Sequence, residues 1–172
     1  MEPTAMTLSS VSEHNAPTTR TVLLKGVENG KFLFFTNYNS RKGKQMMANP
    51  NVCVLFFWPE LERQVNIEGT VQKITPEKSD AYFKSRPWKS RIGAIISPQS
   101  QPISSKNIIK KAFVVEAAKY IGDEIPRPEH WGGFEITPTR IEFWQGRPNR
   151  LHDRVLYSKP NNYSWEISRL AP

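Results

Sequence analysis

The clearest pattern of apolar and polar positions along the chain lies in residues 63–74. Val65, Ile67 and Val71 fall on one side of this segment, whereas polar residues occupy most of the alternate positions. A period of two predicts a half-buried β-strand. Gly69, inside the segment, predicts a bulge or a close approach by another stretch of backbone.

Strands are also predicted for the other short segments that are rich in β-branched or aromatic residues and bounded by turn residues. Residues 51–58 are apolar enough for a buried strand, and residues 26–30, with two glycines and Asn29, predict a hairpin turn. The predicted strands comprise residues 4–11, 18–25, 31–37, 51–58, 63–74, 131–136, 140–144, 152–157 and 163–169.

Helices are predicted where a capping residue precedes a segment without strand periodicity. Ser40 and Thr75 are such caps, and Pro87 ends the helix that follows Thr75. The predicted helices comprise residues 41–48, 76–86, 88–96 and a longer one that Ser104 or Ser105 caps and that ends at residue 120. Short strands linked mostly by turns, with helices inserted, indicate a mainly β fold, an antiparallel barrel or sandwich with helical decoration.

The 172 residues correspond to about one domain, and no linker is long enough to separate two, so we expect a single domain over residues 1–172. Lys and Arg number 24 and Asp and Glu 16, which leaves a net charge of +8. This surplus favours an anionic partner: nucleic acid, a phosphorylated metabolite, a phosphate-bearing cofactor or anionic lipid. A solvated basic surface is the alternative.

The sequence does not predict a disulfide, a metal centre, a membrane helix or a secretory signal. Cys53 is the single cysteine, which excludes an internal disulfide and a cysteine-rich metal centre. No apolar run approaches the roughly 18 residues of a membrane helix, and the N-terminus lacks the pattern of a secretory signal. His14, His130 and His152 lack metal-ligand spacing. We therefore expect a cytoplasmic protein without a metal or a membrane span.

The first candidate site is the start of the helix over residues 41–48. Arg41 and Lys42 place two cations at a helix N-terminus, where the helix dipole favours anions instead. A bound phosphate would make this placement favourable, because backbone N–H groups and both cations would face it. Two solvated surface cations are the alternative reading.

The second candidate lies around Pro87. Tyr82 and Arg86 are four residues apart and share a helix face, and a helix that restarts after Pro87 could bring Ser90 to the same side. A phenol, a guanidinium and a hydroxyl suit a phosphate dianion. An amphipathic surface helix with Tyr82 at its edge is the alternative.

The third candidate is the run from Arg150 to Arg154. If this run is extended, Arg150, His152 and Arg154 share one face, and they would repel one another unless a ligand lay between them. Trp144, just upstream, fits the wall of a cofactor site. A solvent-facing basic edge strand is the alternative.

These stretches, with several others, resemble the pyridoxine (pyridoxamine) 5′-phosphate oxidase family over about residues 3–172. The motifs that carry the resemblance are RTVLLK at 20–25, FTN at 35–37 with SRK at 40–42, ERQV at 62–65, YFKSRP at 82–87, IGA at 92–94 with QS at 99–100, WGGF at 131–134, EFWQG at 142–146, RLHDR at 150–154 and RLAP at 169–172.

The resemblance implies an FMN-binding split β-barrel and a homodimer with FMN at the subunit interface. It implies that Arg20, Arg41 and Lys42 hold the FMN phosphate. The remaining residues that it places at the cofactor are Thr21, Val22, Leu23, Leu24, Lys25, Phe35, Thr36, Gln64, Gln99, Ser100, Trp144 and Arg154. It places Lys25, Tyr82, Arg86 and Ser90 at the substrate phosphate, and Arg150, Leu151 and His152 at the substrate, with Arg150 and His152 as catalytic residues.

The family reaction removes a hydride equivalent from C4′ of pyridoxine or pyridoxamine 5′-phosphate and passes the electrons through FMN to O2. The products are pyridoxal 5′-phosphate and H2O2, with ammonia from the amine. Such chemistry needs positioning and a phosphate clamp rather than a protein nucleophile, and the chain has no nucleophile signature.

The chain departs from the family pattern at two places. Phe35 stands where the family often has tyrosine. The family usually carries an N-terminal extension that helps to cover the substrate, and we expect it to be absent because the chain starts close to its first strand. Two other readings stay open: a flavin-binding split barrel with another substrate, and a basic barrel that binds nucleic acid.

Overall fold

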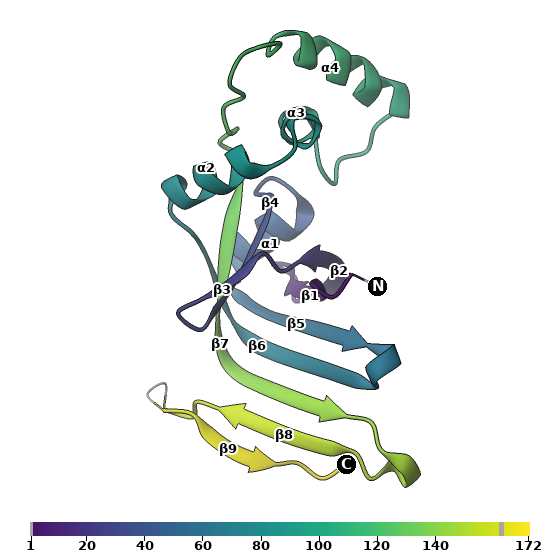
Figure 1. The fold of residues 1–172 in the computed structure, drawn as a ribbon, viewed down its shortest axis with the longest axis vertical. Helices are drawn as coiled ribbons and strands as arrows, with labels where there is room; N and C mark the ends of the chain where they lie inside the picture. The colour runs from purple at the N-terminus through teal and green to yellow at the C-terminus, as the bar shows by residue number, and fades with distance from the viewer. Residues whose placement is uncertain (1, 162–163) are drawn as a thin grey trace. The chain divides into compact units, whose positions relative to one another are not determined.

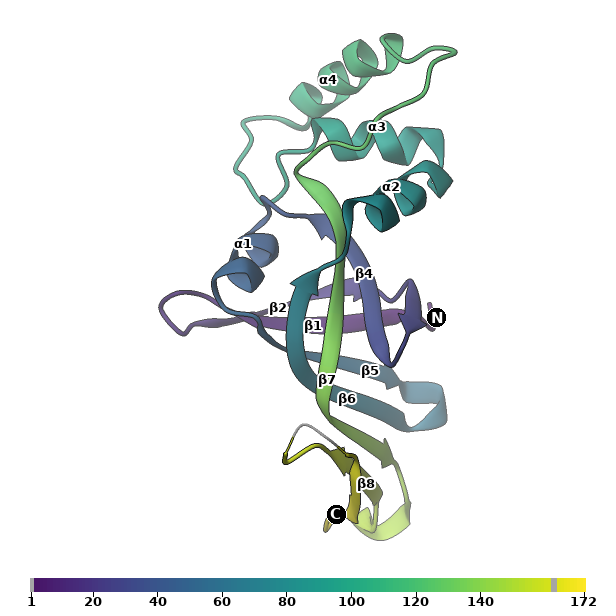
Figure 2. The ribbon, with the colours of Figure 1, turned by 90° about the vertical axis from the view of Figure 1, so that its left-hand side faces the viewer.

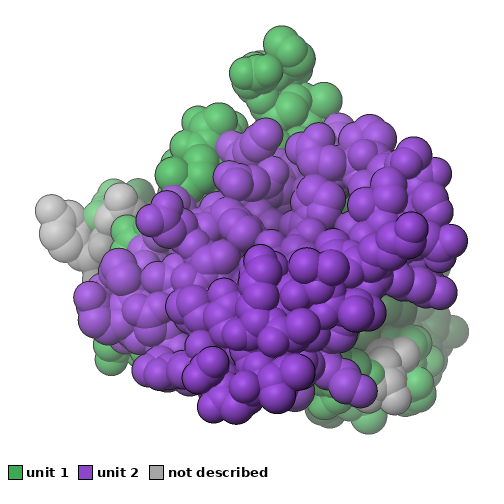
Figure 3. Space-filling view, turned by 90° about the horizontal axis from the view of Figure 1, so that it is seen from above, with its two compact units in different colours: residues 1–34, 45–72, 135–172 green, residues 35–44, 73–134 purple. Residues whose placement is uncertain are grey.

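The computed structural model describes residues 2–161 and 164–172 (Figure 1). The chain forms two compact units, coloured separately in Figure 3. Unit 1 comprises Met1–Phe34, Gln45–Gln72 and Glu135–Pro172, and unit 2 comprises Phe35–Lys44 and Lys73–Phe134. The prediction of a single domain over residues 1–172 stays a prediction.

Nine strands of the described residues belong to one sheet, whose order is β2-β1-β5-β6-β7-β4-β3, with β8 paired to β7 and β9 paired to β8. The strands are β1 (Ala5–Val11), β2 (Pro17–Leu23), β3 (Gly26–Glu28), β4 (Lys31–Asn37), β5 (Asn51–Trp58), β6 (Arg63–Lys73), β7 (Trp131–Gln145), β8 (Asp153–Ser158) and β9 (Glu166–Arg169). The pairs β1–β2, β1–β5, β5–β6, β7–β8 and β8–β9 are all antiparallel. The mainly β prediction is therefore confirmed.

The alternation in β6 sorts its side chains as the sequence predicts. Ile67 and Val71 are buried, whereas Glu68 and Thr70 are exposed. Val54 of β5 pairs with Ile67, so the buried face continues across the two strands. Burial of such apolar side chains contributes about 1.5–3 kcal/mol each, which makes this face a main source of stability in unit 1.

The four described α-helices are α1 (Arg41–Ala48), α2 (Pro76–Ser85), α3 (Trp88–Ile96) and α4 (Lys106–Ala118). The Thr75 hydroxyl caps α2 by accepting from the Lys78 amide, and α2 ends before Pro87 because proline disfavours a helical residue ahead of it. In unit 2, α3 and α4 lie side by side (Figure 2). A core of Phe83, Ile92, Ile125 and Trp131 packs within the same unit.

Strand β7 corrects the prediction of two strands, residues 131–136 and 140–144. It runs unbroken through Pro138, which is buried. A proline interrupts a strand only where its missing N–H is needed for a ladder bond. The predicted close approach at Gly69 occurs beside this point, because a Cβ on Gly69 would lie 2.2 Å from the Thr137 carbonyl oxygen.

Other boundaries also differ from the predictions, most of all in the following segments. The strand predicted to reach Lys25 ends at Leu23, and the turn predicted over residues 26–30 narrows to Asn29 and Gly30, because Gly26–Glu28 pairs with β4 as β3. Asn29 and Gly30 have φ values of 51° and 74°, which suit a two-residue hairpin turn. Of the strand predicted over residues 163–169, the structure has Glu166–Arg169, and Tyr163 lies outside the described residues.

None of the described helices has both the length and the apolar character needed to cross a membrane. The described residues contain no cluster of three or more histidine, cysteine or carboxylate side chains that could hold a metal ion.

We expect Gly69→Ala to destabilise the protein by about 1–3 kcal/mol, because the added methyl group would collide with the backbone of Thr137. Thermal and denaturant unfolding measure this loss. Gly93→Ala is the matched control: a Cβ there meets nothing within 4 Å, and Gly93 lies inside α3. Alanine should stabilise that helix by up to about 1 kcal/mol, and equal effects at both sites would contradict the prediction.

Candidate functional site

The first cluster of predicted site residues centres on Arg20 in β2, within unit 1. Its Nη1 donates to Ser10 Oγ at 2.7 Å and to the Leu8 carbonyl oxygen at 3.2 Å. Its Nη2 donates to Thr18 Oγ1 and to Gln45 Oε1, the latter at 3.3 Å. These four acceptors orient the guanidinium.

The residues that follow Arg20 divide between two faces. Along β2, Arg20 and Val22 are half-buried, whereas Thr21 and Leu23 are exposed, as the period of a strand requires. Leu24 is half-buried and Lys25 is exposed; the Lys25 amide donates to the Leu33 carbonyl oxygen at 2.8 Å. The segment therefore presents Arg20 and Val22 to one side and Thr21 and Leu23 to the other.

The second cluster centres on Lys42 in α1 and lies within unit 2. Lys42 Nζ donates to Thr36 Oγ1 at 3.1 Å, to Gln99 Oε1 at 3.3 Å and to Ser40 Oγ at 3.4 Å. Ser40 also caps the helix, because its hydroxyl accepts from the Gly43 amide. The structure thus brings together Thr36, Lys42 and Gln99, which the sequence separates by up to 63 positions.

Two predicted residues near this cluster are exposed. Arg41 occupies the first position of α1, and Ser100 follows Gln99 with a left-handed backbone at φ 70°. A helix N-terminus with an exposed cation beside it can receive an anion. No hydrogen bond links the side chain of either residue to the Lys42 cluster among the described residues, so their roles stay predictions.

The third cluster surrounds Arg86 in unit 2. The rings of Phe35 and Tyr82 stack with centroids 3.7 Å apart, and the Trp131 ring lies nearly parallel to Phe35 with its centroid 5.5 Å away. Arg86 Cζ lies 4.6 Å from the centroid of Trp131. A guanidinium against an indole face is an attractive contact that also fixes the orientation of the guanidinium plane.

Arg86 has an unusual electrostatic position. Its Nη1 is buried and has no hydrogen-bond partner among the described residues. Burial lowers the pKa of Arg86, and the nearby Tyr82 opposes that shift. A buried donor without a partner costs free energy, about 1–3 kcal/mol, so an anion that accepted from Nη1 would bind with that cost relieved.

Ser90, predicted to join Tyr82 and Arg86, is exposed in α3. Among the described residues, no hydrogen bond connects its hydroxyl to either of them. Tyr82 and Arg86 do lie close to each other, and α3 does restart directly after Pro87. The shared role of the three residues stays a prediction.

The fourth cluster lies where β7 pairs with β8, in unit 1. Trp144 pairs with Arg154, and the ring centroids of Trp144 and His152 are 4.7 Å apart. Arg154 Nε donates to Glu142 Oε1 at 2.7 Å, and its Nη1 donates to the Ala171 carbonyl oxygen at 3.0 Å. The hydrogen bond that Arg154 donates to Glu142 raises the pKa of Arg154, so this charge is already offset. Gln64, on β6, is half-buried opposite Phe57 of β5.

The structure corrects the prediction that Arg150, His152 and Arg154 share one strand face. Pro148–Arg150 form a 3₁₀ turn, and β8 begins only at Asp153. Asn149 and Arg150 have φ values of 58° and 63°, in the left-handed region. The period-two argument fails because two successive left-handed residues turn the chain, so Arg150 and Leu151 precede the strand and are exposed.

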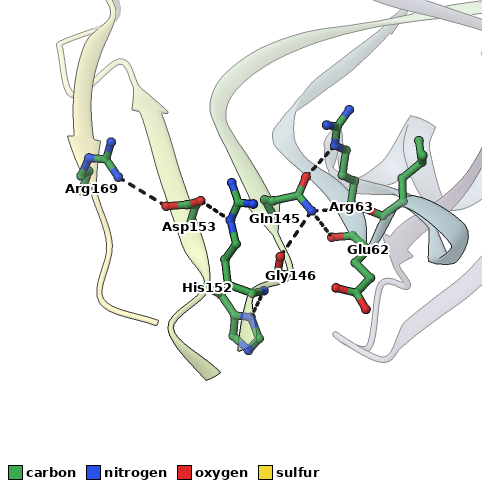
Figure 4. Close-up of polar contacts among 9 residues, drawn as sticks. Glu62, Arg63, Gln145, Gly146, His152, Asp153 and Arg169 are labelled. Carbon is green, nitrogen blue, oxygen red and sulfur yellow. Dashed lines mark hydrogen bonds and ion pairs between the residues drawn. The ribbon is translucent and has the colours of Figure 1, made fainter. Parts of the chain in front are cut away.

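The end of β7 and the β5–β6 turn are joined by hydrogen bonds (Figure 4). Gln145 Oε1 accepts from Arg63 Nε at 2.6 Å, and Gln145 Nε2 donates to the Leu61 carbonyl oxygen at 3.1 Å. The Gly146 amide donates to the Glu62 carbonyl oxygen at 2.7 Å. These bonds fix the point at which the chain leaves β7 for the turn that carries Arg150 and His152.

Sequence reasoning missed several residues that hold the predicted ones in place. Ser10 and Gln45 orient Arg20, Glu142 neutralises Arg154, and Arg147 and Asp153 form an ion pair of 2.7 Å across the turn before β8. Asp153 lies inside the RLHDR motif, which was a usable signal. No sequence signal pointed to Gln45, because its hydrogen-bond partners are 25 to 35 positions away along the chain.

The chemistry of these clusters suits phosphate-bearing aromatic ligands. Arg86 offers a buried donor in need of an acceptor, and Arg20 and Lys42 are cations held by neutral oxygens. Trp144 and the Phe35–Tyr82 pair provide flat apolar surfaces. The residues present therefore fit a flavin phosphate and a phosphorylated substrate, and the described clusters contain no hydroxyl or thiol activated by a base.

Comparisons with known proteins agree over the whole chain. The family described as pyridoxamine 5′-phosphate oxidase matches residues 1–121, and the pyridoxine 5′-phosphate oxidase C-terminal dimerisation region matches residues 131–172. A pyridoxine/pyridoxamine 5′-phosphate oxidase of Bacteroides thetaiotaomicron is 60% identical over 99% of this chain and 80% of its own. One of Chromobacterium violaceum is 56% identical with the same coverage.

Two solved structures share the fold. PhzG from Burkholderia lata, in complex with tetrahydrophenazine-1-carboxylic acid, has a TM-score of 0.94 at 24% identity and covers all of this chain and 84% of its own. A pyridoxamine 5′-phosphate oxidase-related, FMN-binding protein from Nostoc punctiforme has a TM-score of 0.83 at 17% identity, with 100% and 90% coverage. The predicted split-barrel fold is confirmed.

The left-handed backbone conformation of Arg150 leads to a prediction about stability. We expect Arg150→Gly to be more stable than Arg150→Ala by about 1 kcal/mol, because only glycine adopts φ near 63° without steric cost. Denaturant unfolding of both variants measures the difference. At the exposed helical control position Lys44, the order should reverse, with glycine the less stable by about 1 kcal/mol. Glycine losing at both positions would refute the prediction.

Proposed function

Because the chain belongs to the pyridoxamine 5′-phosphate oxidase family, it is an enzyme that oxidises pyridoxine and pyridoxamine 5′-phosphates, and we propose that it does so with FMN as cofactor and O2 as electron acceptor. The observation that carries this conclusion is identity of 55–60% with the curated oxidases of Bacteroides thetaiotaomicron and Porphyromonas gingivalis over nearly the full chain. The alternatives of another substrate and of nucleic-acid binding lose their support, because the similarity covers all candidate clusters.

Arg20, Arg41 and Lys42 would hold the FMN phosphate, together with Thr36. Support comes from the hydrogen bonds that fix the orientation of Arg20 and Lys42, because an oriented cation can donate a charge-assisted hydrogen bond to a phosphate oxygen. The residues proposed around the rest of the cofactor are Thr21, Val22, Leu23, Leu24, Lys25, Phe35, Gln64, Gln99, Ser100, Trp144 and Arg154. When bound, FMN would supply the two-electron acceptor for the hydride equivalent at C4′ and the route to O2.

Arg86 is the proposed centre of the substrate-phosphate site, with Tyr82, Lys25 and Ser90 as further contacts. Its buried Nη1 needs an acceptor, and its stacking on Trp131 fixes the direction of its donors. A phosphate oxygen would satisfy that donor with a charge-assisted hydrogen bond. With the phosphate held at Arg86, other residues would orient the pyridine ring of the substrate.

Arg150, Leu151 and His152 would orient that ring. The turn that carries them is anchored at Gly146 and Gln145, and His152 packs against Trp144. Positioning of C4′ is the main task left to the protein, because a misplacement of about 1 Å can cost roughly 100-fold in rate. Arg150 and His152 are the proposed catalytic residues in this sense.

The match of residues 131–172 to a dimerisation region supports a homodimer. We place FMN at the interface between its subunits as part of the same proposal. Site residues come from segments far apart in the chain, from Arg20 to Arg154, which suits a site that two subunits build together.

Measurements on a single preparation of the purified protein test the proposed function. We expect a yellow protein that releases FMN on denaturation, sediments as a dimer, and converts pyridoxine 5′-phosphate to pyridoxal 5′-phosphate with one H2O2 per aldehyde. With pyridoxamine 5′-phosphate, ammonia should appear in equal amount. A colourless protein that does not take up FMN, or a yellow one inert toward both substrates, would refute the proposal.

Replacement of Arg86 tests the phosphate assignment. We expect Arg86→Ala to weaken binding of phosphorylated substrate by roughly 10- to 150-fold, since a hydrogen bond to a charged group contributes about 1.5–3 kcal/mol, while FMN content stays at one per chain. Lys84→Ala is the control, because Lys84 is an exposed cation in α2, two residues before Arg86, and is paired with Glu124 at 2.7 Å. Loss of FMN with unchanged substrate binding in Arg86→Ala would show that the two phosphate sites are wrongly divided.

A further inference from the structure

The turn between β7 and β8 contains a hydrogen bond that determines the protonation pattern of His152. The backbone amide of Arg147 lies 3.1 Å from His152 Nδ1 (Figure 4). A backbone N–H can only donate, so Nδ1 must be the acceptor of this bond. Neutral His152 therefore carries its proton on Nε2, because a proton on Nδ1 would face the amide hydrogen.

The His152 ring is also fixed in orientation. The Trp144 ring packs against it with a centroid distance of 4.7 Å and an interplanar angle of 43°. Among the described residues, none hydrogen-bonds Nε2. Nδ1 accepts a hydrogen bond from the backbone and Trp144 packs against the ring, so Nε2–H is the polar group of the ring that can still donate to a ligand.

An ion pair closes the turn around this ring. Arg147 Nε donates to Asp153 Oδ2 at 2.7 Å, and Arg169 approaches Asp153 Oδ1 at 3.7 Å. The hydrogen bond from Arg147 lowers the pKa of Asp153, so the carboxylate stays ionised below its usual range. The pair joins the residue whose amide meets His152 to the first residue of β8, and thus spans the whole turn.

We propose that Arg147 and Asp153 are positioning residues, which hold the Arg147 amide against His152 so that the imidazole presents Nε2–H as a hydrogen-bond donor to the substrate. The inference rests on the proposed function for its substrate. It narrows the chemistry of the contact, because the substrate atom that His152 meets must be a hydrogen-bond acceptor, such as the oxygen attached to the pyridine ring, and not a protonated amine.

A merely structural role for the ion pair is distinguishable from positioning. Arg147 and Asp153 side chains are 55% and 43% exposed, and ion pairs at such exposure add little to global stability. Their removal should therefore leave the unfolding midpoint unchanged while turnover falls. If removal of the pair lowered the free energy of unfolding by as much as it raised the activation free energy of turnover, the pair would serve the fold instead.

The first experiment reads the tautomer directly. Protein labelled with ¹⁵N-histidine is examined by long-range ¹H–¹⁵N correlation, with His152 identified by comparison with His152→Gln. We expect Nε2 protonated and Nδ1 bare at a pH where the imidazole is neutral. A proton on Nδ1, or an even mixture of tautomers, would overturn the proposal. This readout needs no substrate, so it stands apart from any failure of the proposed activity.

The second experiment is a double-mutant cycle on the FMN-loaded enzyme. We expect Arg147→Ala and Asp153→Asn each to lower kcat/KM about fivefold to tenfold, with FMN content and the unfolding midpoint unchanged, and the double variant to lose no more than either single one. Arg147→Lys should recover part of the loss. Fully additive effects, or wild-type turnover in both single variants, would refute the coupling.

Two controls complete the test. Glu116→Gln removes an ion pair of the same 2.7 Å length in α4, and it should leave kcat/KM unchanged. His152→Gln places an amide donor near the Nε2 position, whereas His152→Asn places one near Nδ1. We expect the glutamine variant to keep about three- to tenfold more kcat/KM, and the reverse order would contradict a donor at Nε2.

Discussion

The continuous strand β7 is the constraint on which the rest of the structure depends. It runs from Trp131 to Gln145 without interruption at Pro138, and Gly69 allows the neighbouring backbone to approach at Thr137. Its first residue, Trp131, supports Arg86, and its end carries Trp144, which packs against His152. A single strand thus supplies an aromatic platform to a cluster in each unit.

The cationic groups of the candidate site differ in the groups that they contact. Arg20 and Lys42 are held by neutral oxygens, Arg86 keeps a buried donor without a partner, and Arg154 is paired with Glu142. A dianion gains most from cations whose charge is still available. Arg86 therefore suits a phosphate group, whereas Arg154, with its charge offset by Glu142, suits a directional hydrogen bond to a neutral ligand.

The turn before β8 combines strain with anchoring. Two successive left-handed residues are unfavourable, at about 1–2 kcal/mol each for residues with a side chain. The bonds from Gln145 and Gly146 to the β5–β6 turn and the pair between Arg147 and Asp153 hold the chain in this form. Strained backbone is common at functional sites because the surrounding structure must define it. Arg150 itself is exposed in this turn.

Features that depend on neighbouring residues along the chain could be predicted from the sequence. The caps of α1 and α2, the break at Pro87 and the alternation in β6 all follow from local sterics and hydrogen bonding, and each lies where predicted. The motifs also determined the family, and with it the fold. Three features could not be predicted in this way: Pro138 stays within a strand, Gln45 orients Arg20, and Arg150 leaves the strand face of Arg154. These depend on contacts between distant segments, and the energies of such contacts exceed the local preferences from which the predictions were made.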